Sequence, residues 1–174
     1  PYSKKSNKTD DLLVLDYFDK TKYLSLACET FNNVISDGLY WPYRNKKTLN
    51  QFQAYFLSHH CFSITMNEKL VGFFYIKPNF PERCSHICNG GFITLKSYRN
   101  KGIGQFMVES YIMLAKAIGY KGSLFNLVFK SNTASIHLWQ KNNFQHIGTI
   151  PKVAQLNNNQ DYTDGLMYYY DLTQ

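Results

Sequence analysis

Apolar residues recur along the chain with two spacings, and these spacings divide it into strands and helices. Short apolar or alternating runs predict strands at residues 11–18, 61–66, 70–76, 87–95, 123–129, 144–150 and 165–172. Apolar residues at three- and four-residue steps predict helices at residues 20–34, 48–57, 103–118 and 131–143. This order of elements predicts a mixed α/β fold, with helices over a largely antiparallel sheet.

The same pattern predicts the domain organisation. Residues 1–10 include the basic run SKKSNK, which lacks apolar residues, and are expected to be a flexible tail. Residues 11–174 are expected to form one domain, because no repeat or linker interrupts the periodic segments. The polar run NNNQ at residues 157–160 is expected to be a turn between the last two strands.

Composition and charge narrow the class of partner. Hydrophobic residues make up 44% of the chain, and the formal net charge is +7, which favours an anionic partner. The positive charge is not gathered into a stripe with exposed aromatic residues, so we expect no nucleic-acid partner. No apolar run approaches about 18 residues and no secretory signal is visible, so we expect no membrane span and a cytoplasmic location.

Two cysteines and a histidine are spaced as in a metal site, but the sequence supplies no fourth ligand. The run CSHIC brings Cys84, His86 and Cys88 close together, as in a zinc-binding loop. A tetrahedral zinc site needs a fourth ligand at a workable spacing, and no second Cys/His pair supplies one. We therefore expect no metal and reduced thiols.

The segment RNKGIG, at the start of the third predicted helix, carries the most specific chemistry. A helix N-terminus presents unpaired N–H groups and a partial positive charge. Gly102 and Gly104 let the backbone approach a ligand closely, and Arg99 and Lys101 add positive charges. This combination favours a diphosphate ligand, although a glycine-rich turn with solvated basic residues would give the same pattern. The spacing fits neither the P-loop nor the dinucleotide-binding fingerprint.

RNKGIG resembles the Arg/Gln-x-x-Gly-x-Gly/Ala loop of the GNAT superfamily of acetyl-CoA-dependent N-acetyltransferases. NTASIHLWQKNNF is similar to the second signature of that superfamily, which follows about thirty residues later. Within the superfamily, GFFYIKPNFPERCSHICNGGF, IGYKGSLFNLVF and NFQHIG resemble the fungal L-azetidine-2-carboxylate acetyltransferases. The resemblance covers roughly residues 12–172. It implies a GNAT-like sheet that splays around acetyl-CoA and carries helices on both faces.

The resemblance also implies which residues contact acetyl-CoA, the expected cosubstrate. The backbone at the end of the 87–95 strand would line the pantetheine arm, through Phe92, Ile93, Thr94 and Leu95. An N–H group near Ile93 or Thr94 would face the thioester oxygen. The diphosphate would lie on Arg99, Asn100, Lys101, Gly102, Ile103 and Gly104. Asn132 and Ser135 would add contacts at the last helix, where Asn132 alternatively serves only as the helix cap.

Two asparagines are the candidates for catalysis. Asn126 is the only polar residue within the apolar run LFNLVF, and Asn89 precedes the Gly90–Gly91 pair. In the azetidine-type enzymes, the matching asparagines bind the substrate carboxylate and orient its nitrogen. Buried amides need partners, so a structural bridge between strands would also explain them.

The sequence departs from the superfamily at the acid and base positions. NGGFITL contains no glutamate to act as a base, which leaves Glu82 and His86 as nearby ionisable groups, or solvent itself. Trp139 stands where the superfamily often has a tyrosine acid, and it has no ionisable hydroxyl. Asn143 replaces a glycine, and we expect it to keep the left-handed turn.

The sequence therefore predicts an N-acetyltransferase that acts on a small amine, with a cyclic imino acid as the preferred substrate. Two alternatives remain open at this point: an acetyltransferase of peptide or protein N-termini, and a non-catalytic sensor that binds coenzyme A. The YYY run at residues 168–170 is expected to expose aromatic rings and to favour a homodimer paired through this strand.

Overall fold

The structure is a computed structural model that describes residues 1–156 and 162–174. The expected NNNQ turn lies outside the described residues. The strands are β1 (Tyr2–Lys5), β2 (Leu12–Tyr17), β3 (His60–Met66), β4 (Lys69–Pro78), β5 (Ile87–Thr94), β6 (Gly122–Phe129), β7 (Gln145–Gln155) and β8 (Tyr162–Asp171). The helices are α1 (Lys20–Asp37), α2 (Leu49–Phe56), α3 (Ile103–Ile118) and α4 (Thr133–Lys141).

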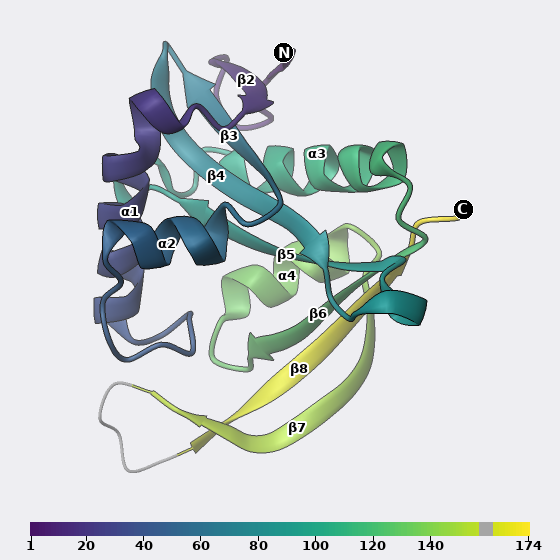
Figure 1. Cartoon of the computed structure of the whole chain (residues 1–174). Coiled ribbons are helices and arrows are strands. Elements are labelled where there is room, and N and C mark those ends of the chain that lie inside the picture. Colours follow the sequence, from purple (N-terminus) through teal and green to yellow (C-terminus); the bar gives the residue numbers. More distant parts are fainter. Residues whose placement is uncertain (157–161) are drawn as a thin grey trace.

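One sheet of eight strands forms the centre of the molecule, in the order β1-β2-β3-β4-β5-β6-β8-β7. Every neighbouring pair is antiparallel except β5 and β6, which are parallel. Helices α1 and α2 cover one face of the sheet, and α3 and α4 cover the other (Figure 1). The expected mixed, largely antiparallel fold with helices on both faces is therefore confirmed.

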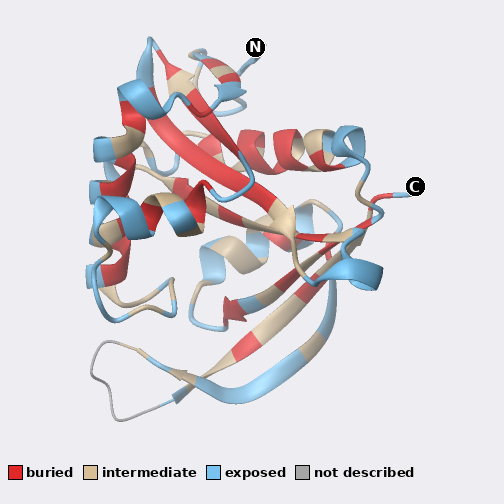
Figure 2. Ribbon diagram, viewed as in Figure 1, coloured by how far each residue is buried: buried red, intermediate tan, exposed pale blue. Residues whose placement is uncertain are grey.

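Two hydrophobic cores lie on the two faces of the sheet. The core beneath α1 and α2 is rich in aromatic rings and includes Phe31, Phe56 and Phe73. The core beneath α3 and α4 includes Phe74, Tyr111 and other side chains from β2, β4, β6 and β8. Buried residues follow the inner side of α1, α2 and α3 and run along most of β4 (Figure 2). Strand β4 is thus buried on both faces, which explains its continuous apolar run.

Three of the four helices begin at a side chain that accepts backbone hydrogen bonds. Asp19 caps α1, Thr48 and Gln51 form a capping box at α2, and Asn132 caps α4. Helix α3 begins instead at Gly102, which has no side chain to satisfy the first N–H groups. The chain therefore leaves one helix N-terminus open to an external acceptor.

Strands β5 and β6 pair only at their first residues, Ile87 with Gly122 and Cys88 with Ser123. Behind this last pair lies Tyr111 of α3, which is fully buried. Its hydroxyl lies 2.7 Å from the Ser123 Oγ and 3.2 Å from the Cys88 Sγ. Burial raises the pKa of Tyr111 well above its usual value, so the phenol stays protonated as a donor. The tyrosine holds the two strands together where they begin to diverge.

The N-terminal residues differ from expectation. Residues 2–5 form β1 and pair with β2, whereas the sequence predicted a flexible tail. The tail was expected because its lysines give no apolar signal. The pairing depends on tertiary contacts instead, including stacking of Tyr2 on Phe106 and an ion pair between Lys4 and Glu109.

The C-terminal tyrosines also differ from expectation. Strand β8 lies between β6 and β7, so both of its edges are paired. Tyr168 is buried, and Tyr169 and Tyr170 are half-buried rather than exposed. The exposed aromatic strand on which the homodimer expectation depended is therefore not formed. Among the described residues, no helix is both long and apolar enough to cross a membrane.

We predict that Tyr111→Phe lowers the free energy of unfolding by about 1–3 kcal/mol, because Ser123 and Cys88 lose a buried partner. Urea unfolding followed by circular dichroism measures this change. Tyr162→Phe is the matched control, because Tyr162 is 58% exposed and should change stability by less than about 0.5 kcal/mol. Equal stability of the two variants would contradict the role of Tyr111.

Candidate active site

The divergence of β5 from β6 leaves one edge of β5 without a partner strand. From Asn89 to Thr94, β5 pairs with β4 on its other edge only. Leu95 donates its N–H to the carbonyl of Val71, 3.0 Å away, which fixes the alternation along the strand. Alternate residues direct their N–H groups to the same edge, so Ile93 faces β4, while Phe92 and Thr94 face the opening.

This alternation bears on the four expected pantetheine contacts. Phe92 and Thr94 present N–H groups to the opening and Ile93 does not, so Phe92 and Thr94 are the candidate donors to a thioester. The backbone of Leu95 is already used, because its carbonyl also accepts from the N–H of Tyr98 at 2.9 Å. The Leu95 N–H is therefore not available to a ligand, although Leu95 lines the adjoining cavity.

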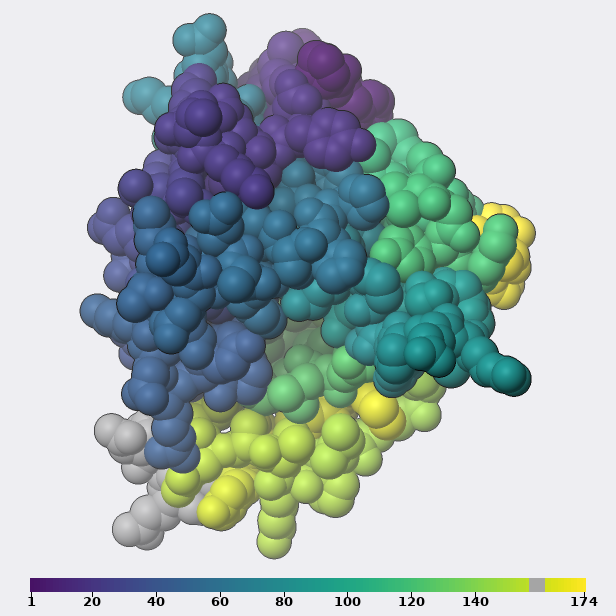
Figure 3. All heavy atoms as spheres, in the orientation of Figure 1, coloured from purple at the N-terminus to yellow at the C-terminus, as the bar shows by residue number. Residues whose placement is uncertain are grey.

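A cavity of about 620 Å³ lies where β5 ends, between α1 and the loop that leads into α3. It is lined by Thr30, Asn33, Val34, Ser36, Asp37, Thr94, Leu95, Lys96, Ser97 and Arg99. Figure 3 shows a further recess between the blue α1–α2 region and the yellow-green β7–β8 hairpin, with green atoms at its bottom. The open edge of β5 thus continues into space large enough for a ligand arm.

The N-terminus of α3 is the structural counterpart of the RNKGIG motif. Its first backbone hydrogen bond runs from the Phe106 N–H to the Gly102 carbonyl, at 3.1 Å. The N–H groups of Ile103, Gly104 and Gln105 have no partner within the described part of the chain. Gly102 has a φ of 81°, a left-handed conformation that favours glycine. Open N–H donors at a helix N-terminus are suited to an anionic ligand.

The charged side chains of the loop lie next to aromatic rings. The Arg99 guanidinium is 5.6 Å from the ring centre of Tyr40, and the Lys101 Nζ is 5.3 Å from that of Tyr98. Neither cation pairs with a carboxylate of the described residues. Asn100, at a φ of 63°, makes the turn between them. Ile103 points its buried side chain into the core, so only its backbone can meet a ligand.

Three asparagines meet at the apex of the opening. Asn79 and Asn126 exchange two hydrogen bonds, with nitrogen–oxygen distances of 2.7 and 2.6 Å. Asn89 donates to the Asn79 Oδ1 at 3.2 Å and accepts from the Gly90 N–H at 2.7 Å. The structure thus brings the two predicted asparagines together through Asn79. Sequence reasoning missed Asn79 because it follows Pro78 in what reads as a loop.

An aromatic wall stands beside the asparagines on the α1–α2 face of the sheet. Tyr55 accepts a hydrogen bond from the Trp41 Nε1 at 3.3 Å, and its hydroxyl lies 3.3 Å from that of Tyr75. A Cβ on Gly91 would lie 2.5 Å from the Tyr75 ring and 2.8 Å from Trp41. Gly91 therefore lets both rings lie flat against the strand.

Lys77 is a second feature that sequence reasoning missed. It pairs with Asn89 across the β4–β5 ladder, and its Nζ lies 4.2 Å from the ring centre of Tyr55 and 4.4 Å from that of Tyr75. It is half-buried and has no carboxylate partner among the described residues. Burial lowers its pKa, because the ammonium loses hydration that the rings replace only in part.

Helix α4 closes the opening from the other face. The Asn132 side chain accepts a hydrogen bond from the Ser135 N–H at 3.2 Å. Asn132 therefore acts as the cap of α4 in this structure, and the Ser135 N–H is occupied by that bond. Trp139 is buried against Phe92 and Phe125, and its Nε1 has no partner among the described residues. Asn143 has a φ of 62°, which confirms the expected left-handed turn.

The expected acid–base and metal candidates lie apart from these groups. Glu82 and His86 are both exposed and make no hydrogen bond to the three asparagines. Cys84 is exposed while Cys88 is buried, so CSHIC does not converge on one point. Residues 1–156 and 162–174 hold no group of three or more His, Cys, Asp or Glu side chains that could bind a metal ion.

Comparison with known proteins places this geometry in a family. Residues 21–144 match the acetyltransferase (GNAT) family. The chain is 48% identical over 108 residues to the N-acetyltransferase aca1 of Schizosaccharomyces pombe, a match that covers 62% of this chain and 52% of that protein. It is 30% identical over 111 residues to Protein SPT10 of Saccharomyces cerevisiae, covering 64% of this chain and 17% of that protein. The chain thus spans about half or less of these relatives.

Solved structures share the fold over nearly the whole chain. A GCN5-related N-acetyltransferase from Kribbella flavida has a TM-score of 0.86 at 20% identity, covering 91% of this chain and 97% of the other. An N-acetyltransferase from Staphylococcus aureus Mu50 has 0.82 at 25% identity, covering 92% and 98%. The acetyltransferase yncA from Salmonella typhimurium, solved with its cofactor acetyl-CoA, has 0.83 at 14% identity, covering 92% and 94%.

The family match takes in α1 through α4, including the open edge of β5 and the N-terminus of α3. The cosubstrate of this family is acetyl-CoA, with which the yncA neighbour was solved. The chain belongs to the acetyltransferase (GNAT) family.

Proposed function

We propose that this protein is an acetyl-CoA-dependent N-acetyltransferase that acetylates the ring nitrogen of a small cyclic imino acid, such as azetidine-2-carboxylate or another proline analogue. The observation that carries the proposal is the asparagine cluster at the apex of the β5–β6 opening, between an open strand edge and an aromatic wall. Its amide groups can hold an acceptor at the closed end of the opening, toward which the pantetheine arm runs along β5 in this proposal.

Acetyl-CoA lies along the open edge in this proposal. The diphosphate binds the unpaired N–H groups at the start of α3, with Arg99 and Lys101 as counter-charges. The pantetheine arm runs along β5, where Phe92 and Thr94 offer N–H groups. Of these two residues, Phe92 lies nearer the asparagine cluster, so its N–H donates to the thioester oxygen as negative charge develops on it.

The acceptor lies against the aromatic wall. Trp41, Tyr55 and Tyr75 form an apolar surface suited to a small ring, with the asparagine cluster at one end. Lys77 provides a positive charge that pairs with no carboxylate among the described residues, so an acceptor carboxylate supplies its counter-charge. Asn89 and Asn126 orient the ring nitrogen and hold the carboxylate, while Asn79 keeps Asn126 in place.

The reaction is direct acyl transfer. The neutral ring nitrogen attacks the thioester carbonyl carbon and the C–N bond forms. The tetrahedral intermediate collapses as the C–S bond breaks and releases the thiolate of coenzyme A, and the nitrogen gives up its remaining proton to solvent. Freeing the amine, of pKa near 10, from its first proton costs about 4 kcal/mol at pH 7. No carboxylate among the described residues is bonded to the asparagine cluster, so solvent takes this proton too. The thiolate, with a pKa near 8.5, leaves without a phenol acid.

The direct test is a free-thiol assay of acetyl-CoA with three kinds of acceptor: cyclic imino acids, polyamines and short peptides. We expect azetidine-2-carboxylate to accelerate thiol release, and mass spectrometry to find acetyl on its ring nitrogen. Turnover of peptides without turnover of imino acids would favour a peptide N-terminal acetyltransferase instead. Binding of coenzyme A with no turnover of any acceptor would favour a sensor.

We predict that Lys77→Met raises the KM for azetidine-2-carboxylate by about 10- to 100-fold, because a charge-assisted contact to the carboxylate is lost. The KM for acetyl-CoA should stay within about twofold. Lys69→Met is the matched control, since Lys69 is an exposed lysine at the start of the same strand. Unchanged acceptor KM in Lys77→Met, with wild-type activity present, would remove Lys77 from the acceptor site.

A further inference from the structure

The N-terminal hairpin, residues 2–17, touches the loop that leads into α3. Its turn is closed by a hydrogen bond from the Ser6 N–H to the Asp11 carbonyl, at 2.9 Å. The Ser6 hydroxyl donates to the carbonyl of Lys101 at 2.7 Å. The same oxygen accepts from the N–H groups of Lys8 and Thr9 at 3.2 and 3.3 Å. Ser6 therefore joins the turn of the hairpin to the diphosphate loop.

The contact is close enough to require a glycine in the loop. A Cβ on Gly102 would lie 2.7 Å from the Ser6 Oγ and would also collide with the Asn7 Oδ1. The φ of 81° at Gly102 independently favours glycine. Two features therefore favour glycine at this position: the closeness of the hairpin side chains and the left-handed turn of the loop beneath the hairpin tip.

The bond from Ser6 also sets the direction of a donor. The Lys101 carbonyl and the Gly102 N–H belong to one planar trans peptide, so they point in opposite directions. Because Ser6 draws the carbonyl toward the hairpin, the Gly102 N–H points away from it. A carbonyl that turned the other way would present a partial negative charge to a bound diphosphate and would remove one N–H group from it.

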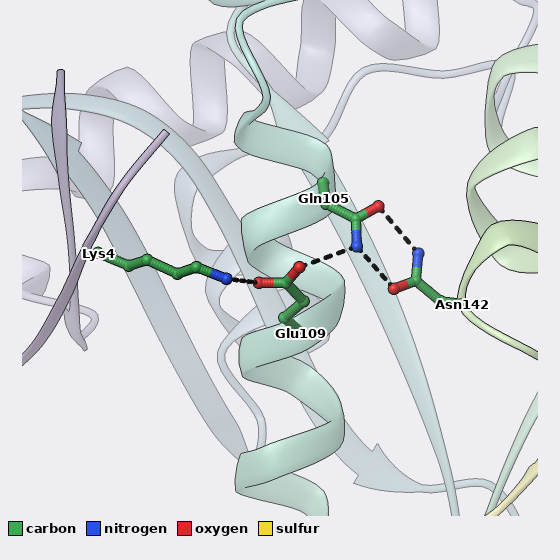
Figure 4. Close-up of polar contacts among 4 residues, drawn as sticks. All are labelled: Lys4, Gln105, Glu109 and Asn142. Atoms are coloured by element: carbon green, nitrogen blue, oxygen red, sulfur yellow. Dashed lines mark hydrogen bonds and ion pairs between the residues drawn. The ribbon is translucent and has the colours of Figure 1, made fainter. Parts of the chain in front are cut away.

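The hairpin is anchored further along α3, so its tip cannot swing freely. The Lys4 Nζ lies 2.8 Å from the Glu109 Oε2, and Glu109 accepts from the Gln105 Nε2 at 3.0 Å (Figure 4). Gln105 and Asn142 exchange two further hydrogen bonds of 2.8 and 3.1 Å, which tie in the end of α4. The Tyr2 ring stacks on Phe106 with 6.0 Å between ring centres.

We propose that the N-terminal hairpin is part of the coenzyme site, and that Ser6 is a positioning residue that holds the Arg99–Gly104 loop in its diphosphate-binding conformation. The inference rests on the proposed function, which places the diphosphate on this loop. Ser6 does not touch the thioester or the acceptor. Its contribution is therefore confined to the nucleotide end of the donor molecule.

The experiment compares two acetyl donors in the intact protein carrying Ser6→Ala. Acetyl-CoA contains the diphosphate, and S-acetylpantetheine lacks it. We expect the KM for acetyl-CoA, and the Kd of coenzyme A measured by calorimetry, to rise about five- to tenfold. We expect kcat with acetyl-CoA and kcat/KM with S-acetylpantetheine to stay within about twofold. Ser85→Ala is the matched control, because Ser85 is exposed and lies outside the hairpin, in the segment between β4 and β5.

A merely structural role for Ser6 would weaken the use of both donors alike, and that result would overturn the proposal. So would an unchanged Kd of coenzyme A in Ser6→Ala beside a wild type that binds it. A wild type that binds no coenzyme A would instead refute the proposed function, and the positioning role with it. Ser6→Thr retains the hydroxyl and is expected to recover at least half of the lost affinity.

Discussion

The feature on which the site depends is the early end of pairing between β5 and β6. Two residue pairs join these strands, and beyond Cys88 and Ser123 each continues without the other. The divergence exposes backbone donors on β5 that a continuous sheet would have consumed. The buried Tyr111 hydroxyl, bonded to both strands at their last pair, holds the apex in place. Because these two parallel strands pair and then separate, backbone groups form much of the site, and few specific side chains are needed.

The charged and polar groups of the site form two sets, one near the apex of this opening and one beyond the end of β5. The asparagine cluster and Lys77 lie at or beside the apex, whereas Arg99, Lys101 and the uncapped start of α3 lie beyond the end of β5. In the proposed function, the cosubstrate and the acceptor approach from different sides. The net charge of +7 suits acetyl-CoA, whose phosphates are anionic. The two charged regions use cations without carboxylate partners in the described residues, which keeps them available for ligand.

The sequence predicted the elements of the fold well because their signals are local. Helical periodicity, caps such as Asn132 and the turn at Asn143 each depend on a few neighbouring residues. The expectation of a flexible N-terminal tail was wrong because β1 is stabilised by residues far away in sequence, among them Phe106 and Glu109. The motif RNKGIG identified the loop, but the role of Asn79 and the half-burial of Lys77 depend on which strands adjoin them. No periodic pattern carries that information.

The measurement that tests the central claim most directly is amide hydrogen exchange, resolved by residue, with and without acetyl-CoA. If the open edge of β5 and the start of α3 hold the cosubstrate, exchange at Phe92, Thr94 and residues 102–105 slows on binding. Exchange within the already paired β3–β4 interior should stay the same. Binding of acetyl-CoA that leaves the exchange of Phe92 and Thr94 unaltered, or protection confined to another surface, would contradict this account of the molecule.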